Sequence, residues 1–204
     1  MSERVRVALT FDAEHPDRPG CPPGTVERIL DDLATAAARA TFFVQGRWAQ
    51  AYPAAAARIA GAGHLVGCHS HFHAEMPLLS DAGLAADITA AGDAVRATSG
   101  VDPRPWFRCP FGAGADDPRV LDAIAAGGYR NVGWHVAVDD WEPDRSGDVV
   151  ARDTIHGIDE HGDDTVVLLH TWPEATAHAL PTILNELRRR DAVTATVDEL
   201  RELP

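Results

Sequence analysis

Hydrophobic and polar positions alternate between two patterns along the chain. Short apolar runs bounded by polar or glycine-rich residues are typical of buried strands, and apolar residues three or four positions apart are typical of helices that pack on a sheet. The first pattern predicts strands over 5–11, 41–44, 64–68, 105–108, 131–138, 165–169 and 193–197. The second predicts helices over about 26–33, 48–62, 80–100, 117–128, 147–161 and 183–187, with a helical turn at the end.

This order of elements predicts the fold class. Roughly seven β/α units follow one another, with no linker, internal repeat or low-complexity tract. Strands that alternate with helices are typical of a parallel sheet covered by helices. Such a sheet either closes into a barrel or stays open and doubly wound, and periodicity does not choose between the two. We expect one α/β domain over residues 1–204.

Composition excludes several classes of function. The formal net charge is 18 − 31 = −13, whereas a nucleic-acid surface needs clustered lysine and arginine. We therefore expect no nucleic-acid partner. The chain has no lysine at all, which excludes Schiff-base, pyridoxal-phosphate and Walker-lysine chemistry. A hydrolase built on carboxylates, histidines and a metal ion stays open.

The cysteines and the first residues bear on the cellular compartment. Cys21, Cys68 and Cys109 form neither a disulfide framework nor a paired Cys-x-x-Cys zinc site. The chain starts directly with a predicted strand, without the apolar segment of a secretion signal, and no apolar run approaches membrane-spanning length. We expect a cytoplasmic protein with no membrane partner, and its oligomeric state stays open.

Residues that can carry chemistry follow the predicted strands. They are Asp12 and Glu14 after the first strand, His69, His71 and His73 after the third, Arg108 at the fourth, Asp139, Asp140 and Trp141 after the fifth, and His170 at the sixth. In parallel β/α folds the loops at the carboxyl ends of the strands converge and form the active site. Polar loops explain one or two such groups, but five at one edge indicate an active site.

The segment His69-Ser70-His71-Phe72-His73 is the sharpest indication of a metal site. In a helical turn, His69 and His73 lie four residues apart on one face and can reach one ion, while His71 points elsewhere. In an extended segment all three histidines share one face instead, an alternative that we favour less. A divalent site also needs a carboxylate, which Asp12 and Glu14 can supply.

Five ordered motifs resemble those of the polysaccharide deacetylase family, also called the NodB homology domain or carbohydrate esterase family 4. They are Thr10-Phe11-Asp12-Ala13-Glu14, His69-Ser70-His71-Phe72-His73, Arg108-Cys109-Pro110-Phe111-Gly112, Asp140-Trp141 and Leu168-Leu169-His170. They cover nearly the whole chain, and their order makes the resemblance strong although each motif alone is weak. The resemblance implies a single-domain, incomplete (β/α)7 barrel of the NodB type over residues 1–204.

Two positions depart from the family pattern. The family's first motif is Thr-Phe-Asp-Asp, and its second aspartate binds the metal, but this chain has Ala13 there. Some relatives carry the acid one residue later, so the resemblance implies Glu14 as the metal ligand together with His69 and His73. Without Glu14, two histidines alone would hold a metal poorly. In the fourth motif, the aspartate often found three positions before Asp-Trp is Ala137.

The resemblance implies a metal-dependent hydrolase that removes N-acetyl or O-acetyl groups from a carbohydrate or a small N-acetylated sugar. The implied cofactor is a divalent ion, Zn2+ first, with Co2+ or Ni2+ as alternatives. Asp12 is then the general base, paired with Arg108, and His170 is the general acid, oriented by Asp140. The implied substrate-binding residues are Phe111 through its backbone N–H, Trp141 and Leu168 as a wall for the acetyl methyl, and Trp172 as a stacking surface for a sugar.

Two other functions stay open. Relatives with an altered first motif include allantoinase-like and imidase-like hydrolases of cyclic amides, and the small size of the chain favours a small substrate. A non-catalytic sugar-binding module that lost its ligand set at Ala13 is the second alternative, although such a module needs neither Asp12 nor His170. Trp141 and Trp172 can also be ordinary packing at the rim of the barrel.

Overall fold

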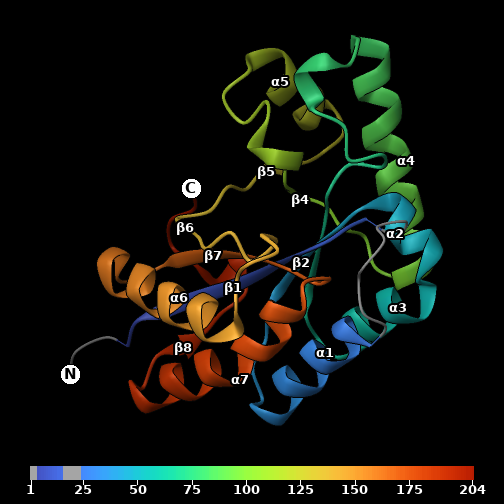
Figure 1. Cartoon of the computed structure of the whole chain (residues 1–204). Helices are drawn as coiled ribbons and strands as arrows, with labels where there is room; N and C mark the ends of the chain where they lie inside the picture. The colour runs from blue at the N-terminus through green and yellow to red at the C-terminus, as the bar shows by residue number, and fades with distance from the viewer. Residues whose placement is uncertain (1–3, 16–23) are drawn as a thin grey trace. The chain divides into compact units, whose positions relative to one another are not determined.

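The computed structural model describes residues 4–15 and 24–204 (Figure 1). Cys21 lies outside these residues. The described residues form two compact units, one from residues 4–11, 24–41 and 134–204 and the other from residues 12–15 and 42–133. The expectation of one domain over the whole chain stays a prediction.

The first unit contains the start of β1 and three later strands. Its strands are β1 (Arg6–Ala13, of which residues 6–11 belong here), β6 (Val136–Ala137), β7 (Thr165–His170) and β8 (Val193–Thr194). β7 lies between β1 and β6, and β8 pairs with β1. Val136 pairs in parallel with Val167, as Arg6 does with Val193. The helices are α1 (Thr25–Thr35), α6 (Gly147–His161) and α7 (Glu174–Arg189), and α7 packs against both others (Figure 1).

The second unit contains four short strands in chain order. They are β2 (Thr41–Val44, of which residues 42–44 belong here), β3 (Leu65–Cys68), β4 (Trp106–Phe107) and β5 (Arg130–Asn131), each beside the next. Cys68 pairs in parallel with Phe107, as Trp106 does with Arg130. The helices are α2 (Gly46–Ala51), α3 (Pro53–Gly61), α4 (Asp81–Ser99) and α5 (Pro118–Ala126), and α4 packs against the other three.

Burial on both faces explains why the strands are continuous apolar runs. Every residue of β7 is buried, and so is every residue of β1 from Val7 to Ala13. Strands that are covered on both faces need no polar alternation. The carboxyl ends of β1, β3 and β7 depart from this apolar pattern. Polar residues are buried there, and Asp12, His69 and His170 are each less than 9% exposed.

The predicted helix ends of α4 and α5 are confirmed. The hydroxyl of Ser80 accepts a hydrogen bond from the N–H of Gly83, and the carboxylate of Asp117 accepts one from the N–H of Arg119. Both are N-caps that satisfy amides left without a helical partner. Gly100 ends α4 in the left-handed conformation, with φ 78°, which glycine adopts without steric cost.

Several predicted elements differ from those observed. The helix predicted over 48–62 is two helices, because Pro53 has no amide hydrogen and starts α3 as its first residue. The strand predicted over 131–138 is two separate short strands, β5 and β6. The last strand ends at Thr194, and a short 3-10 helix, η3 (Val197–Glu199), follows it.

The first strand is longer than predicted. It runs to Ala13, two residues beyond the expected end at Phe11. Asp12 therefore lies within β1, and Glu14 is the first residue after it.

Within residues 4–15 and 24–204, none of the helices combines the length and the apolar character needed to span a bilayer.

Gly92 on α4 makes room for Tyr129, because a Cβ at this position would lie 2.4 Å from the tyrosine hydroxyl. That hydroxyl accepts a hydrogen bond from the buried thiol of Cys68 at 3.5 Å. We predict that Gly92→Ala lowers the free energy of unfolding by about 1–3 kcal/mol, as overpacking of a core does.

Gly61→Ala is the matched control. A Cβ at Gly61 meets nothing within 4 Å, so helix propensity alone should raise the free energy of unfolding by up to about 1 kcal/mol. Chemical denaturation measures both variants. Equal effects of the two substitutions would contradict the packing of Tyr129 against α4.

Candidate functional site

Three predicted metal ligands converge in the second unit. Glu14, His69 and His73 each offer one donor atom, and these atoms all lie within 4.8 Å of one another. Oε2 of Glu14 lies 3.1 Å from Nε2 of His69 and contacts Nε2 of His73, and the two Nε2 atoms are 3.2 Å apart. All three side chains are buried. Two imidazole nitrogens and a carboxylate oxygen around one point are a donor set that zinc accepts.

The loop after β3 brings His69 and His73 together without a helix. The predicted helical turn is wrong, because residues 69–75 are irregular. Ser70 and His73 both have φ 58°, in the left-handed region. The hydroxyl of Ser70 accepts a hydrogen bond from the N–H of His73 at 2.9 Å, which closes the turn. His71 lies outside the ligand cluster, as predicted.

Asp87 on α4 holds the middle of this loop. One of its oxygens accepts the N–H of His71 at 2.9 Å, and the other accepts the N–H of Phe72 at 3.0 Å. Asp87 is 5% exposed, so these amides and the carboxylate satisfy one another away from water. At the start of α2, Gly46 leaves space for the loop, because a Cβ there would lie 2.3 Å from Nδ1 of His71.

Further contacts orient the donor atoms of the cluster. Nδ1 of His69 lies 2.9 Å from the carbonyl oxygen of Arg108, so Nδ1 carries the proton in this contact and the lone pair of Nε2 faces Glu14. The other oxygen of Glu14, Oε1, lies 3.1 Å from Nε2 of His15. The two oxygens of Glu14 are thus divided between His15 on one side and the two cluster histidines on the other.

Burial and charge act in opposite directions on the pKa values of the cluster. Burial raises the pKa of Glu14, but hydrogen bonds with His15, His69 and His73 outweigh it and hold that pKa well below its usual range. Burial lowers the pKa of His73. Burial would also lower the pKa of His69, but the charges of Asp12 and Glu14 outweigh it and raise that pKa. Glu14 is therefore ionised at neutral pH, as a carboxylate ligand must be.

Arg108 is fully buried and orients Asp12. Its Nη1 donates to Oδ1 of Asp12 at 2.9 Å, while its Nε and Nη2 donate to the carbonyl oxygens of Val132 at 3.1 Å and Gly133 at 2.8 Å. Burial lowers the pKa of Arg108, and the charge of Asp12 opposes that shift. The other carboxylate oxygen of Asp12 lies 3.6 Å from Nε2 of His69. Asp12 therefore sits at the edge of the ligand cluster.

Phe111 lies against the same cluster. Its ring centroid is 4.5 Å from that of His73, and the residue is 65% exposed. Its backbone has φ 59° inside the short 3-10 helix η2 (Pro110–Gly112), a conformation that costs energy for a bulky residue and is often found at functional sites. The predicted role of its N–H stays a prediction.

Asp140 and His170 form a second group, in the first unit. Oδ1 of Asp140 lies 2.7 Å from Nδ1 of His170, and Oδ2 accepts the backbone N–H of His170 at 2.8 Å. This contact assigns the Nδ1 proton to the bond with Asp140, so Nε2 is the nitrogen through which His170 can exchange a proton with a substrate. Leu168 lies two residues earlier on β7 and hence on the same face of the strand.

Two tryptophans contact His170 and line a pocket in the same unit. The ring centroids of Trp141 and Trp172 lie 5.1 and 6.0 Å from that of His170. The pocket is about 380 Å3 in volume, and Asp140, Trp141, Pro143, Trp172 and Pro173 are among its lining residues. Glu142, Arg145, Glu174 and His178 also line it, so the lining is mixed, and its size suits a small organic ring.

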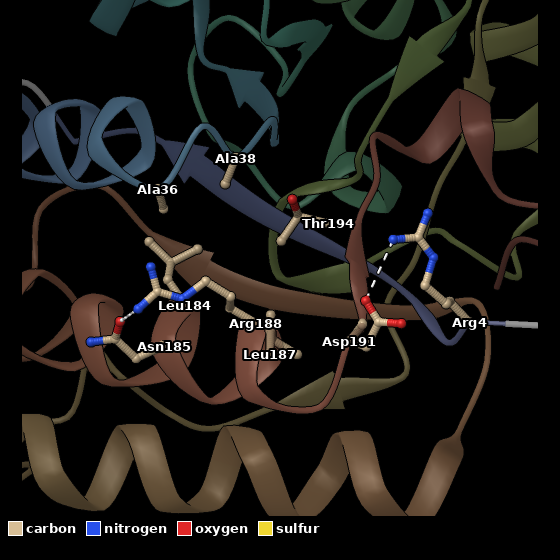
Figure 2. Close-up of a pocket in the computed structure, with 10 residues that line it drawn as sticks. Arg4, Ala36, Ala38, Leu184, Asn185, Leu187, Arg188, Asp191 and Thr194 are labelled. Atoms are coloured by element: carbon tan, nitrogen blue, oxygen red, sulfur yellow. Dashed lines mark hydrogen bonds and ion pairs between the residues drawn. The ribbon is translucent and has the colours of Figure 1, made fainter.

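A pocket of about 250 Å3 elsewhere in the first unit contains none of the predicted site residues (Figure 2). It lies beside the last turns of α7 and β8. Figure 2 shows that its charged side chains already have partners: Arg188 donates to Asn185 at 2.9 Å, and Arg4 lies 3.6 Å from Asp191. We assign this pocket no part in the chemistry.

The sequence patterns did not identify three residues that support the site. They are Asp87, Asn131, whose side-chain oxygen accepts the N–H of Cys109 at 3.0 Å, and Thr176, whose hydroxyl donates to Asp140. Each acts on a residue 16 or more positions away. A signal existed for Asp87, because it stands among the apolar positions of α4, between Leu84 and Ile88.

We predict that Asp87→Ala lowers the free energy of unfolding by about 1–3 kcal/mol for each of the two amides that it leaves unsatisfied. Asp93→Ala on the same helix is the control, since the Asp93 side chain is 69% exposed and its loss should change stability by less than about 0.5 kcal/mol. Denaturant titration of both variants tests this. An Asp87→Ala variant as stable as Asp93→Ala would show that the loop after β3 keeps its conformation without Asp87.

Residues 2–132 match the family model described as polysaccharide deacetylase. The peptidoglycan-N-acetylmuramic acid deacetylase PdaA of Bacillus subtilis is 27% identical over 195 residues, which are 95% of this chain and 70% of PdaA. A family 4 carbohydrate esterase from Streptomyces lividans, solved in complex with acetate, is 28% identical, with a TM-score of 0.81 over 94% of this chain and 92% of the esterase.

A third similar protein is BA3943 from Bacillus anthracis, described as a CE4 family pseudoenzyme. Its mutant with restored enzymatic activity is 26% identical to this chain, with a TM-score of 0.84 over 98% of this chain and 68% of the mutant. These similarities confirm the predicted fold class, the incomplete (β/α)7 barrel. The comparison also shows that this fold occurs in proteins with and without activity.

Proposed function

The chain belongs to the polysaccharide deacetylase family, hydrolases that act on carbon–nitrogen bonds, and on this premise we propose that it is a metal-dependent N-deacetylase of an N-acetylated sugar. The observation that carries the proposal is the convergence of Glu14, His69 and His73 on one point, with Asp12 at its edge. Position 13, where the family's first motif has its second aspartate, is alanine in this chain, and we propose that Glu14 supplies the carboxylate instead.

The three converging side chains fit a divalent ion. They offer two imidazole nitrogens and an ionised carboxylate oxygen in a buried place, and the bond from Nδ1 of His69 to the carbonyl oxygen of Arg108 directs Nε2 inward. Such donors suit zinc, with cobalt and nickel as alternatives. A bound ion would supply Lewis acidity, lowering the pKa of a water molecule and polarising the acyl oxygen of the substrate.

Asp12 is the proposed general base. Arg108 binds one of its oxygens, which leaves the other directed toward the ligand cluster, 3.6 Å from Nε2 of His69. A carboxylate fixed in this way can take the proton of the attacking water without first reorienting. The backbone N–H of Phe111 is the proposed donor to the oxyanion, an interaction typically worth about 3–4 kcal/mol in other hydrolases.

His170 is the proposed general acid. Asp140 accepts the Nδ1 proton of the imidazole and favours the charged ring, so Nε2 can deliver a proton to the departing amine. Amide hydrolysis needs this step because an amine leaves only after it is protonated. Leu168 and Trp141 are the proposed wall for the acetyl methyl group.

The pocket beside His170 supports a carbohydrate substrate. Trp141, Trp172, Pro143 and Pro173 line it together with polar and charged residues, a mixture that suits the C–H faces and the hydroxyl groups of a sugar ring. PdaA is named for an N-acetylated sugar of peptidoglycan, so an N-acetylated amino sugar is the substrate class that we propose. The polymer or oligomer that carries this sugar is left to experiment.

Removal of Glu14 tests the metal site. We predict that the wild-type protein retains about one zinc ion per chain after dialysis and that Glu14→Ala retains almost none, because two imidazoles alone bind zinc weakly. Glu75→Ala is the control, since Glu75 is an exposed carboxylate two residues after His73. Elemental analysis gives the zinc content, and an unchanged content in Glu14→Ala would refute the ligand assignment.

Removal of the base tests the reaction. We predict that the zinc-loaded protein releases acetate from oligosaccharides of N-acetylglucosamine and that Asp12→Asn lowers kcat by about 100-fold or more while zinc is retained. An enzymatic acetate assay measures the rate. Turnover of a cyclic imide without acetate would replace the proposal with a cyclic amide hydrolase. Sugar binding with no turnover would indicate a non-catalytic module.

A further inference from the structure

Thr176, in the first turn of α7, contacts the Asp140–His170 pair. It is fully buried, and its Oγ1 lies 2.5 Å from Oδ2 of Asp140. An ionised carboxylate only accepts hydrogen bonds, so the threonine hydroxyl is the donor in this contact. Asp140 itself is 1% exposed. The contact therefore forms without competition from bulk water.

Asp140 receives three hydrogen bonds from one short segment of chain. The imidazole of His170 lies against Oδ1, while the backbone N–H of His170 and the hydroxyl of Thr176 both donate to Oδ2. β7 ends at His170 and α7 begins at Glu174, so the carboxylate joins the two ends of the β7–α7 connection. With two donors on Oδ2, the carboxylate cannot rotate without breaking both bonds, and Oδ1 stays on the imidazole.

We propose that Thr176 is a positioning residue for the reaction, acting through Asp140 to fix the orientation of the imidazole of His170. This inference rests on the proposed function, in which His170 protonates the leaving amine. The hydroxyl also withdraws part of the negative charge of the carboxylate. Without it, Asp140 would attract the proton of the imidazolium more strongly, so His170 would retain its proton to higher pH.

Four charged or titratable side chains line the pocket that adjoins Asp140. They are Glu142, Arg145, Glu174 and His178. Arg145 donates to Asp153 and to the carbonyl oxygen of Val138, and the other three are exposed. The side chains of Thr176 and His170 both contact the carboxylate of Asp140 directly.

The test compares two substitutions at Thr176 with one elsewhere. Thr176→Val keeps the shape and removes the hydroxyl, whereas Thr176→Ser keeps the hydroxyl. Thr154→Val is the matched control, because Thr154 is also fully buried in a helix of the same unit and its hydroxyl has no hydrogen-bond partner among residues 4–15 and 24–204. If Thr176→Val does not fold, Thr176→Ala takes its place.

We expect Thr176→Val to lower kcat for acetate release about 10-fold, with KM changed less than about twofold, and to move the alkaline limb of the kcat–pH profile upward by about half a pH unit. Thr176→Ser should stay within about twofold of the wild type, and Thr154→Val should match it. A Thr176→Val variant with wild-type kcat and pH profile would overturn the inference.

A second measurement separates this inference from the proposed function. The imidazole of His170 can be titrated by NMR in the wild type and in Thr176→Val, without any substrate. A wild type that releases no acetate would end the proposed function, and the NMR titration would still test the contact. An unchanged titration midpoint of His170 in Thr176→Val would refute the electrostatic part of the role, and unchanged ring chemical shifts would refute the positioning.

Discussion

The site depends on one buried charge, the guanidinium of Arg108. Its nitrogens bind Asp12 and two backbone carbonyls, and its own carbonyl oxygen accepts the Nδ1 proton of His69. One residue thus orients both the proposed base and a proposed metal ligand. A buried ion pair is weak evidence of stability, because desolvation offsets much of the attraction, and removal of one partner leaves the other charge stranded at a cost of about 3–5 kcal/mol. Arg108 is best understood as a means of orientation.

The same kind of contact recurs in each of the two units. In the second unit, Asp87 accepts the amides of His71 and Phe72 and so shapes the loop of His69 and His73. In the first unit, Asp140 accepts both the amide and the ring proton of His170. In each case a buried carboxylate accepts one or two backbone N–H groups at the end of a strand or in the loop that follows it. The proposed functional side chains come from strand ends and from the loops after them, and Asp87 on α4 and Thr176 on α7 help to hold them.

Much of this architecture could be predicted from the sequence, and the remainder has identifiable causes. Apolar runs and capping residues predicted the longer helices and strands. Both signals come from residues that are close together in the sequence. The choice of a barrel came from the motifs, since periodicity does not specify sheet closure. The loop after β3 was predicted as helical, and the left-handed backbone of Ser70 and His73 depends on contacts with the rest of the fold. Asp87 and Thr176 were missed for the same reason, as the partners of Asp87 lie 15 and 16 positions away and the partner of Thr176 lies 36 positions away.

The extension of β1 through Ala13 has a consequence for how this family pattern can change. Side chains alternate along a strand, and Asp12 and Glu14 both reach Nε2 of His69, at 3.6 and 3.1 Å. Ala13 lies between them and is completely buried. An aspartate at position 13 would therefore point away from His69 and take a completely buried position. The Asp-x-Glu order of this chain thus keeps both acids on one side of β1, with one small apolar residue between them.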